Sequence, residues 1–155
     1  MQWPGRWLDV TAMTWGFTLW GQPPSVNRMY EPAWKTANDG RMYKGKRLSD
    51  VAAKYRDDAV LIIQAAKPSG WAPEGQVRIY WAFYLNNETD CDNAMKLIHD
   101  AIQKATGIDD KRYLPCVLSK EIRLPARKVR VEIIVDEVRG SLLSDLATLR
   151  SIRTP

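Results

Sequence analysis

The stretch that decides the fold covers residues 76–106 and reads QVRIYWAFYLNNETDCDNAMKLIHDAIQKAT. Its first part, residues 76–86, alternates apolar residues with others, which predicts a strand with one buried face. Its last part, residues 93–106, repeats apolar residues with the three- and four-residue spacing of an amphipathic helix. Asp90 and Asp92 lie between the two elements. The stretch therefore predicts a strand and a helix joined by an acidic segment.

The apolar positions of these two elements define a predicted core. They are Val77, Ile79, Trp81, Phe83 and Leu85 on the strand, and Ala94, Leu97, Ile98, Ala101, Ile102 and Ala105 on the helix. Asp92 is placed to cap the start of the helix, and Gly107 is placed to close its end.

The flanking segments predict the remaining elements. Strands are expected over residues 14–20, 113–122 and 127–137, and a helix over 49–66 with Ser49 as its N-cap. The apolar face of that helix holds Val51, Ala52, Tyr55, Ala59, Ile62, Ile63 and Ala66. Residues 36–46 are expected to form a loop or hairpin, and residues 142–152 a short helix or a partner-binding segment. Because strands and helices do not strictly alternate, we expect a single α+β domain with a mixed sheet.

Length and composition narrow the class of protein. The 155 residues suffice for one domain with its own core, and 45% of them are apolar. No run of about 18 apolar residues occurs, which argues against a membrane-spanning helix. The first residues lack the apolar core of a secretory signal, so we expect a cytoplasmic protein. Two cysteines 25 residues apart and one histidine fit no zinc site, and a structural disulfide is disfavoured in a reducing compartment.

The positive charge of the chain is concentrated in one segment. The formal charge is +5 and the pI is near 9.3. Between Lys35 and Arg56, seven basic residues stand against two acidic ones, so this segment alone carries a net charge of +5. Trp34, Tyr43 and Tyr55 are interleaved with them, which suits contact with nucleic-acid phosphates and bases. A solvated loop would explain these charges equally well, so the segment alone leaves both interpretations open.

The doublet of Asp90 and Asp92 is unusual in a basic chain. If they lie in extended backbone their carboxylates point to the same side, and at about 5 Å they repel by about 3 kcal/mol. A divalent cation such as Mg²⁺ or Mn²⁺ would remove that repulsion. The simpler interpretation assigns Asp92 to helix capping and Asp90 to solvent. Asp109 and Asp110 follow at the far end of the helix, and we expect one of them to join the pair only if the next strand lies beside residues 76–86.

The doublet belongs to a longer ordered series. It reads Asp90-Cys91-Asp92-Asn93-x-x-Lys96-x-x-x-Asp100-Ala101, followed by Gly107, Asp109-Asp110 and Lys120. Together with PPSVNRMY at residues 23–30, this series resembles the RusA-type Holliday-junction resolvases, small endodeoxyribonucleases of bacteria and their phages. The likeness covers roughly residues 16–137. It leaves residues 1–15 and 138–155 as terminal extensions of unknown role.

The resemblance implies a set of site residues. Asp90, Asp92 and Asp110 would hold catalytic Mg²⁺, for which Mn²⁺ substitutes, and Lys96 would be needed for cleavage. Asp109 remains the alternative third ligand, because the segment after Gly107 is shorter than is usual in the family. The expected DNA contacts are Asn27, Arg28, Lys44, Lys46, Arg47 and Lys120, and the expected supporting residues beside the metal are Asn93 and Asp109.

For Lys96, His99 and Asp100 on the predicted helix, a structural role is the simpler interpretation. Lys96 lies four residues before Asp100, so an ion pair worth a few tenths of a kcal/mol is the alternative to catalysis. Asp100 and His99 are themselves expected to be structural.

The implied activity is Mg²⁺-dependent, structure-selective cleavage of four-way DNA junctions by paired symmetric nicks. A homodimer would place one site at each of two symmetry-related strands. Water activated by the metal would attack the phosphodiester and leave a 5′-phosphate and a 3′-hydroxyl. The alternative is a protein that binds DNA junctions without cutting them. A Mg²⁺ enzyme acting on nucleotides is disfavoured, because the chain has no GxxxxGK[ST] phosphate loop. The resemblance also implies a bacterial or phage-encoded protein of the cytoplasm.

Overall fold

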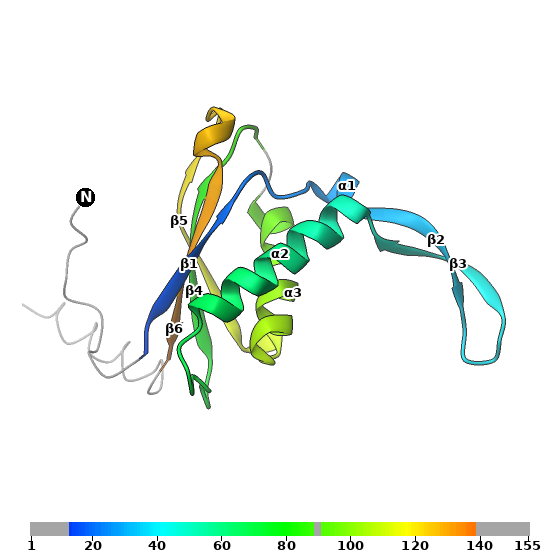
Figure 1. The fold of residues 1–155 in the computed structure, drawn as a ribbon, viewed down its shortest axis with the longest axis horizontal. Helices are drawn as coiled ribbons and strands as arrows, with labels where there is room; N and C mark the ends of the chain where they lie inside the picture. Colours follow the sequence, from blue (N-terminus) through cyan, green and yellow to red (C-terminus); the bar gives the residue numbers. More distant parts are fainter. Residues whose placement is uncertain (1–12, 89–90, 139–155) are drawn as a thin grey trace, which may run out of the picture.

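One sheet and two long helices form the body of the protein, and a separate hairpin extends from it (Figure 1). The structure is a computed structural model that describes residues 13–88 and 91–138. The elements in chain order are β1 (Trp15–Trp20), α1 (Val26–Met29), β2 (Tyr30–Thr36), β3 (Met42–Leu48), α2 (Asp50–Ala66), β4 (Val77–Tyr84), α3 (Cys91–Thr106), η1 (Asp110–Arg112), β5 (Tyr113–Glu121), η2 (Ala126–Lys128) and β6 (Arg130–Glu137).

The four strands of the main sheet lie in the order β1-β6-β4-β5. β6 pairs antiparallel with both β1 and β4, whereas β5 pairs parallel with β4. A parallel pair requires a long crossover, and α3 provides it between β4 and β5. The prediction of a single α+β domain with a mixed sheet is confirmed.

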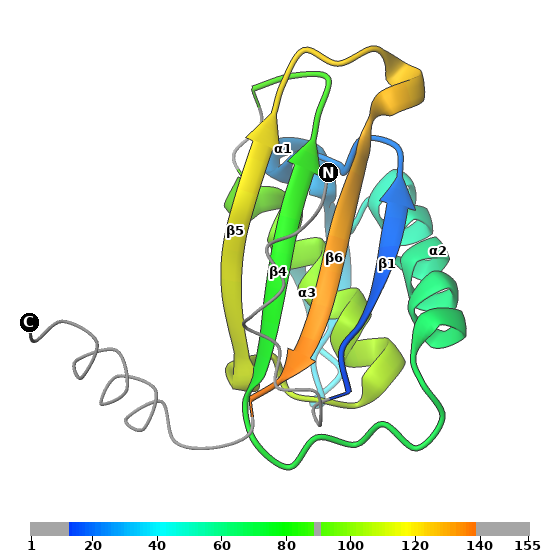
Figure 2. The ribbon, with the colours of Figure 1, turned by 90° about the vertical axis from the view of Figure 1, so that its left-hand side faces the viewer.

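Helices α2 and α3 cover the same face of the sheet. Figure 2 views the sheet from its other face, with both helices behind the strands. The alternating residues of β4 point into this layer, and Val77, Ile79, Trp81, Phe83 and Leu85 are all fully buried. On α3 the predicted stripe is buried from Ala94 to Ile102, while Ala105 packs at its edge. Gly107 follows the helix with φ of 75°, a conformation that glycine adopts without strain, so its predicted role at the helix end is confirmed.

The start of α3 differs from the prediction. The helix begins at Cys91, two residues before the predicted start, so Asp92 lies in its first turn and is not its N-cap. The extended backbone assumed for the acidic doublet therefore does not apply to Asp92. A carboxylate in the first turn is still favourable there, because the helix dipole is positive at that end.

Helix α2 follows its prediction closely at the start and less well on its face. Ser49 is the N-cap, and its hydroxyl oxygen accepts a hydrogen bond from the Ala52 amide at 3.3 Å. Val51 and Ile62, predicted to face the core, are 69% and 38% exposed. Fewer apolar residues of α2 are buried than the sequence predicted, because only the side of the helix toward β1 and α3 is covered.

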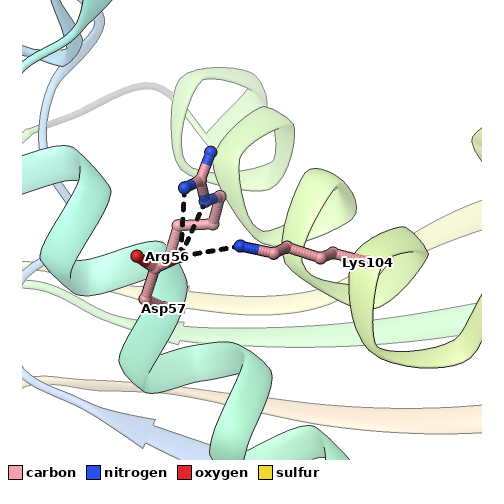
Figure 3. A network of polar contacts seen from close by, with 3 residues as sticks. All are labelled: Arg56, Asp57 and Lys104. Carbon is pink, nitrogen blue, oxygen red and sulfur yellow. Dashed lines mark hydrogen bonds and ion pairs between the residues drawn. The ribbon is translucent and has the colours of Figure 1, made fainter.

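A surface network joins the two helices (Figure 3). The Asp57 carboxylate on α2 accepts hydrogen bonds from Lys104 on α3 at 3.1 Å and from its neighbour Arg56 at 3.0 and 3.1 Å. These two cations lower the pKa of Asp57. Because the Asp57 and Lys104 side chains are more than half exposed, the buried apolar layer contributes most of the attraction between the helices.

The segment predicted as a loop or hairpin forms the hairpin β2–β3, which projects away from the sheet (Figure 1). None of its residues from Tyr30 to Leu48 is fully buried. Its base is fixed by the Ser49 amide, which donates to the Met29 carbonyl at 2.9 Å, and by the Ser49 hydroxyl, which donates to the Arg28 carbonyl at 2.6 Å.

Two further predictions concern the end of the chain. The strand predicted over 127–137 begins later, at Arg130, because residues 126–128 form the short helix η2. The segment 142–152 lies outside the described residues. Among the helices of the described ranges, none is long and apolar enough to cross a membrane.

Candidate active site

A hollow of about 230 Å³ runs along the exposed side of α3. Residues spaced by three, four, seven and eight positions share one side of a helix, which brings five residues of α3 to its wall. One residue of η1 completes the lining. The lining residues are Asp92, Met95, Lys96, His99, Asp100 and Asp110.

The predicted catalytic residues are distributed unevenly around this hollow. Asp92, Lys96 and Asp110 all border it. Asp90 lies outside the described residues, so its place relative to them stays a prediction. Within residues 13–88 and 91–138, no three acidic, histidine or cysteine side chains lie close enough to hold one ion.

The parallel pairing of β4 and β5 decides where Asp110 lies. Tyr113 at the start of β5 pairs with Val77 at the start of β4, whereas Asp92 follows the far end of β4. Adjacency of the two strands is confirmed, yet it does not bring the acidic groups together through the sheet. They approach along α3, where Asp110 interacts electrostatically with His99 and Asp100. Asp100 is eight residues from Asp92, which is about 12 Å along the helix axis.

Asp109 and Asp110 have different roles in the structure. The Asp109 carboxylate caps η1 by accepting a hydrogen bond from the Lys111 amide at 3.0 Å. That hydrogen bond holds the pKa of Asp109 below its usual value. Asp110 is the residue of the two that borders the hollow, so its carboxylate is the better placed to contribute to a site there.

Asp100 was expected to be structural, and it is half-buried in the wall of the hollow. Burial raises its pKa, and the negative charge of Asp110 acts in the same direction. The positive charges of Lys96 and Arg56 oppose this shift. Among the described residues, Lys96 and Asp100 form no ion pair within 4 Å, so the alternative role of Lys96 in such a pair is not observed.

The surroundings of His99 in the hollow are not evident from its position in the sequence. Its ring lies 5.2 Å from the ring of Trp81 and 5.3 Å from that of Tyr113, between centroids. Burial lowers its pKa, and Asp110 partly offsets that effect. Its buried Nε2 has no hydrogen-bond partner in the described part of the chain. The available signal was spacing, since His99 lies seven residues after Asp92 and three after Lys96.

The basic hairpin has two unlike faces. Strand register places Lys44 opposite Trp34 and Lys46 opposite Pro32, so both lysines share one face with the tryptophan. Lys44 lies over the Trp34 ring, with Nζ 5.7 Å from its centroid. Arg47 is on the other face, where it forms an ion pair with Glu31 at 2.5 Å.

The remaining predicted DNA contacts are exposed. Asn27 and Arg28 lie on α1, immediately before the hairpin. Lys120 lies on β5 opposite the buried Phe83, so it shares the helix-covered side of the sheet and emerges at its edge. Asn93 lies in the first turn of α3, and its side chain is outside what the structure describes.

Carboxylates and a lysine gathered along one hollow, beside a projecting basic hairpin, are features expected of an enzyme that acts on nucleic-acid phosphodiesters. The family model for the endodeoxyribonuclease RusA matches residues 21–136, which is well over half of the chain. The protein therefore belongs to the RusA family of Holliday-junction endodeoxyribonucleases, and the resemblance drawn from its motifs is confirmed. No curated protein matches the chain.

Proposed function

We propose that the hollow along α3 is the cleavage site of this endodeoxyribonuclease. The observation that carries the proposal is that Asp92, Lys96 and Asp110, which are separated by up to 18 positions in sequence, border the same hollow. Two acidic groups and a cation that border one hollow fit the chemistry of a phosphodiester better than they fit helix capping alone.

The donor set of the hollow suits a hard divalent cation. Carboxylate oxygens are the ligands that Mg²⁺ and Mn²⁺ prefer, and the acids that border the hollow are Asp92, Asp100 and Asp110. We infer that Asp92 and Asp110 hold Mg²⁺ together with Asp90, which directly precedes α3. When bound, Mg²⁺ supplies Lewis-acid activation of water and neutralises charge on the scissile phosphate.

Three further residues stabilise the phosphate or support the metal ligands. The Lys96 ammonium, from the second turn of α3, offsets negative charge on the phosphate as it becomes pentacovalent. Asp109 holds the backbone of η1 by its cap to the Lys111 amide, which fixes the direction of Asp110. Asn93 supports the metal-side carboxylates from the first turn of the helix.

Binding of the branched substrate relies on the hairpin. Lys44 and Lys46 supply phosphate contacts, and Arg47 adds a smaller contribution because it already pairs with Glu31. Asn27 and Arg28 extend this basic surface along α1, and Lys120 contacts DNA from the edge of the sheet.

We further infer a homodimer that nicks two symmetry-related strands of the junction. A two-fold protein matches the two-fold relation of those strands, so each subunit meets an equivalent phosphodiester. Such substrates arise in the cytoplasm of bacteria and of phage-infected cells, which is where we expect the protein to act.

The direct test is incubation of a synthetic four-way junction with the protein and Mg²⁺. We expect paired nicks at symmetric positions, cleavage with Mn²⁺ in place of Mg²⁺, and no cleavage with excess EDTA. Bound junctions that remain uncut with both metals would favour the alternative of a junction-binding protein.

A pair of matched variants tests the site. Asp92→Asn is expected to slow cleavage by more than about 100-fold, beyond the 10- to 100-fold typical of residues one step removed from a metal. Binding should be retained or tightened, because a carboxylate that repels the phosphate is lost. Asp57→Asn, which changes an exposed acid of α2 outside the hollow, should cut at the normal rate. Equal rates for the two variants would contradict the assignment.

A further inference from the structure

The candidate catalytic lysine contacts the base of the hairpin. Lys96 Nζ lies over the ring of Tyr30, 5.6 Å from its centroid. Tyr30 is the first residue of β2 and directly follows α1, so it belongs to the hairpin and not to the sheet or to α3. The contact therefore joins the chemical site to the element that carries the basic surface.

The Tyr30 ring is fixed from behind by a small buried cluster. Met29, Ala52 and Leu97 form this cluster, and all three are fully buried. Tyr30 and its strand partner Leu48 both pack against it. Because Leu97 adjoins Lys96 on α3, the ring is held against the helix turn from which Lys96 extends. The cluster thus fixes the hairpin base relative to α3.

The Tyr30 ring restricts the positions that the Lys96 ammonium can adopt. Lysine has a long flexible side chain, and a cation over an aromatic face is attracted to it without losing its charge. Lys96 also lies four residues from both Asp92 and Asp100, so either carboxylate competes for its ammonium. The Tyr30 ring favours one position of the ammonium over these alternatives.

We propose that Tyr30 is a positioning residue that holds the Lys96 ammonium at the cleavage site and couples its position to DNA engagement by the hairpin. This inference rests on the proposed catalytic role of Lys96. Force exerted on the hairpin by bound DNA reaches Lys96 through the Tyr30 ring, since that ring is part of β2.

The contact itself is tested by NMR without DNA or metal. The full-length protein is labelled with ¹³C at the ε carbon of lysine, and the Lys96 signal is identified by its loss in Lys96→Met. Protons above an aromatic ring are shifted upfield, so the Lys96 signal, like that of Lys44 over the Trp34 ring, should stand upfield of the other lysines. Tyr30→Phe should retain this shift and Tyr30→Leu should abolish it. A Lys96 signal that is unchanged in Tyr30→Leu would overturn the proposed contact.

The coupling is tested by single-turnover cleavage of a four-way junction at saturating protein. Tyr30→Leu should slow cleavage by about two- to fivefold, the factor that corresponds to a cation–π contact at an exposed site. Tyr30→Phe should restore the wild-type rate. Junction affinity, measured with Ca²⁺ in place of Mg²⁺, should change less than twofold in both variants.

Two controls separate positioning from general damage. Tyr55 packs against the same cluster without lying over Lys96, so Tyr55→Leu removes a ring and should leave the rate unchanged below its melting temperature. In a Lys96→Met background, Tyr30→Leu should have no further effect on the residual rate. Equal slowing by Tyr30→Leu in both backgrounds, or no rescue by Tyr30→Phe, would overturn the coupling while leaving the proposed function intact. A wild-type protein that shows the NMR shift but cuts no junction would instead contradict the proposed function.

Discussion

Two aspartates of the candidate site, nine positions apart, respond oppositely to their surroundings. Burial raises the pKa of Asp100, whereas the hydrogen bond from the Lys111 amide lowers the pKa of Asp109. A raised pKa means that the folded state favours the protonated carboxyl, so ionisation of Asp100 costs stability as the pH rises through its folded pKa. For Asp109 the sign is reversed, and stability is lost as the pH falls below the usual value of 3.8 and through its folded pKa.

Asparagine at each position provides a test of these signs. Asp100→Asn should melt at a higher temperature than the wild type at pH 7, with the difference disappearing near pH 3, where Asp100 is protonated. Asp109→Asn should melt at a lower temperature at pH 7, and its deficit should shrink as the pH falls. Calorimetry in EDTA measures both without interference from metal. A lower melting temperature for Asp100→Asn at pH 7 would show that its carboxylate is stabilised by Lys96 and Arg56 more than it is penalised by burial.

Sequence patterns anticipated some residues of the site and missed others for a physical reason. Asp92, Lys96 and Asp110 were predicted from an ordered motif, and all three border the hollow. His99 was set aside because a lone histidine has no metal-ligand spacing, and spacing contains no information about the Trp81 and Tyr113 rings that enclose it. The contact of Tyr30 with Lys96 joins residues 66 positions apart, which no local pattern reports.

At the scale of an element, the hairpin has one face that carries Trp34, Lys44 and Lys46 and another on which Arg47 is ion-paired. The face with Trp34, Lys44 and Lys46 presents exposed cations around an aromatic ring that is 63% exposed. On the other face Arg47 is engaged by Glu31. An arginine that must leave an ion pair gains less from a phosphate than a lysine that forms no ion pair among the described residues.

The two faces predict different effects on the salt dependence of junction binding. Each phosphate contact contributes about 0.9 to the slope of log affinity against log salt concentration. Neutralising both lysines, as Lys44→Ala with Lys46→Ala, should reduce that slope by about 2 and weaken binding. Arg47→Ala should reduce it by less than about 1. Fluorescence anisotropy over a salt series measures the slopes, and Lys54→Ala on α2 serves as the control for a charge away from the hairpin.

An unchanged slope in the double lysine variant would remove this face from the interface. The sequence predicted the hairpin and its charge, because the basic residues are local. It did not predict which residues share a face, since strand register depends on the turn at residues 37–41, and a shift of one residue would exchange the two faces.

Across the whole molecule, one layer of apolar side chains joins the sheet to both helices. Ile79 lies in the central strand β4 and is fully buried, whereas Ile62 on α2 is 38% exposed. The same substitution at these two positions therefore separates the energetic value of the shared layer from the intrinsic effect of losing an isoleucine.

Ile79→Ala is expected to lower the free energy of unfolding by about 2–5 kcal/mol, because it leaves a cavity that its neighbours fill only in part. Ile62→Ala should change it by about 0.5 kcal/mol, as is usual for surface sites. Urea unfolding followed by tryptophan fluorescence and by circular dichroism should give coincident transitions for a single domain. Separate transitions for the two signals would show that the helices and the sheet unfold independently.

The fold class followed from patterns, while the arrangement of the strands did not. Alternation in residues 76–86 and the stripe of α3 were visible because each element must bury one face. The parallel pairing of β5 with β4 is a choice among sheet orders that have equally buried faces. That choice places Asp110 beside the middle of α3, which is why the sequence could name this residue without locating it.

The hairpin leaves and rejoins the body at one point, because the Ser49 amide is hydrogen-bonded to the Met29 carbonyl. Its two ends are thus already held together by a contact that does not depend on the length or composition of the segment between them. A hairpin attached in this way can be exchanged for another segment. We expect that a differently shaped or longer ribbon inserted between Tyr30 and Leu48, which would keep their contacts with the buried cluster, would alter nucleic-acid binding while the scaffold beneath stays as it is.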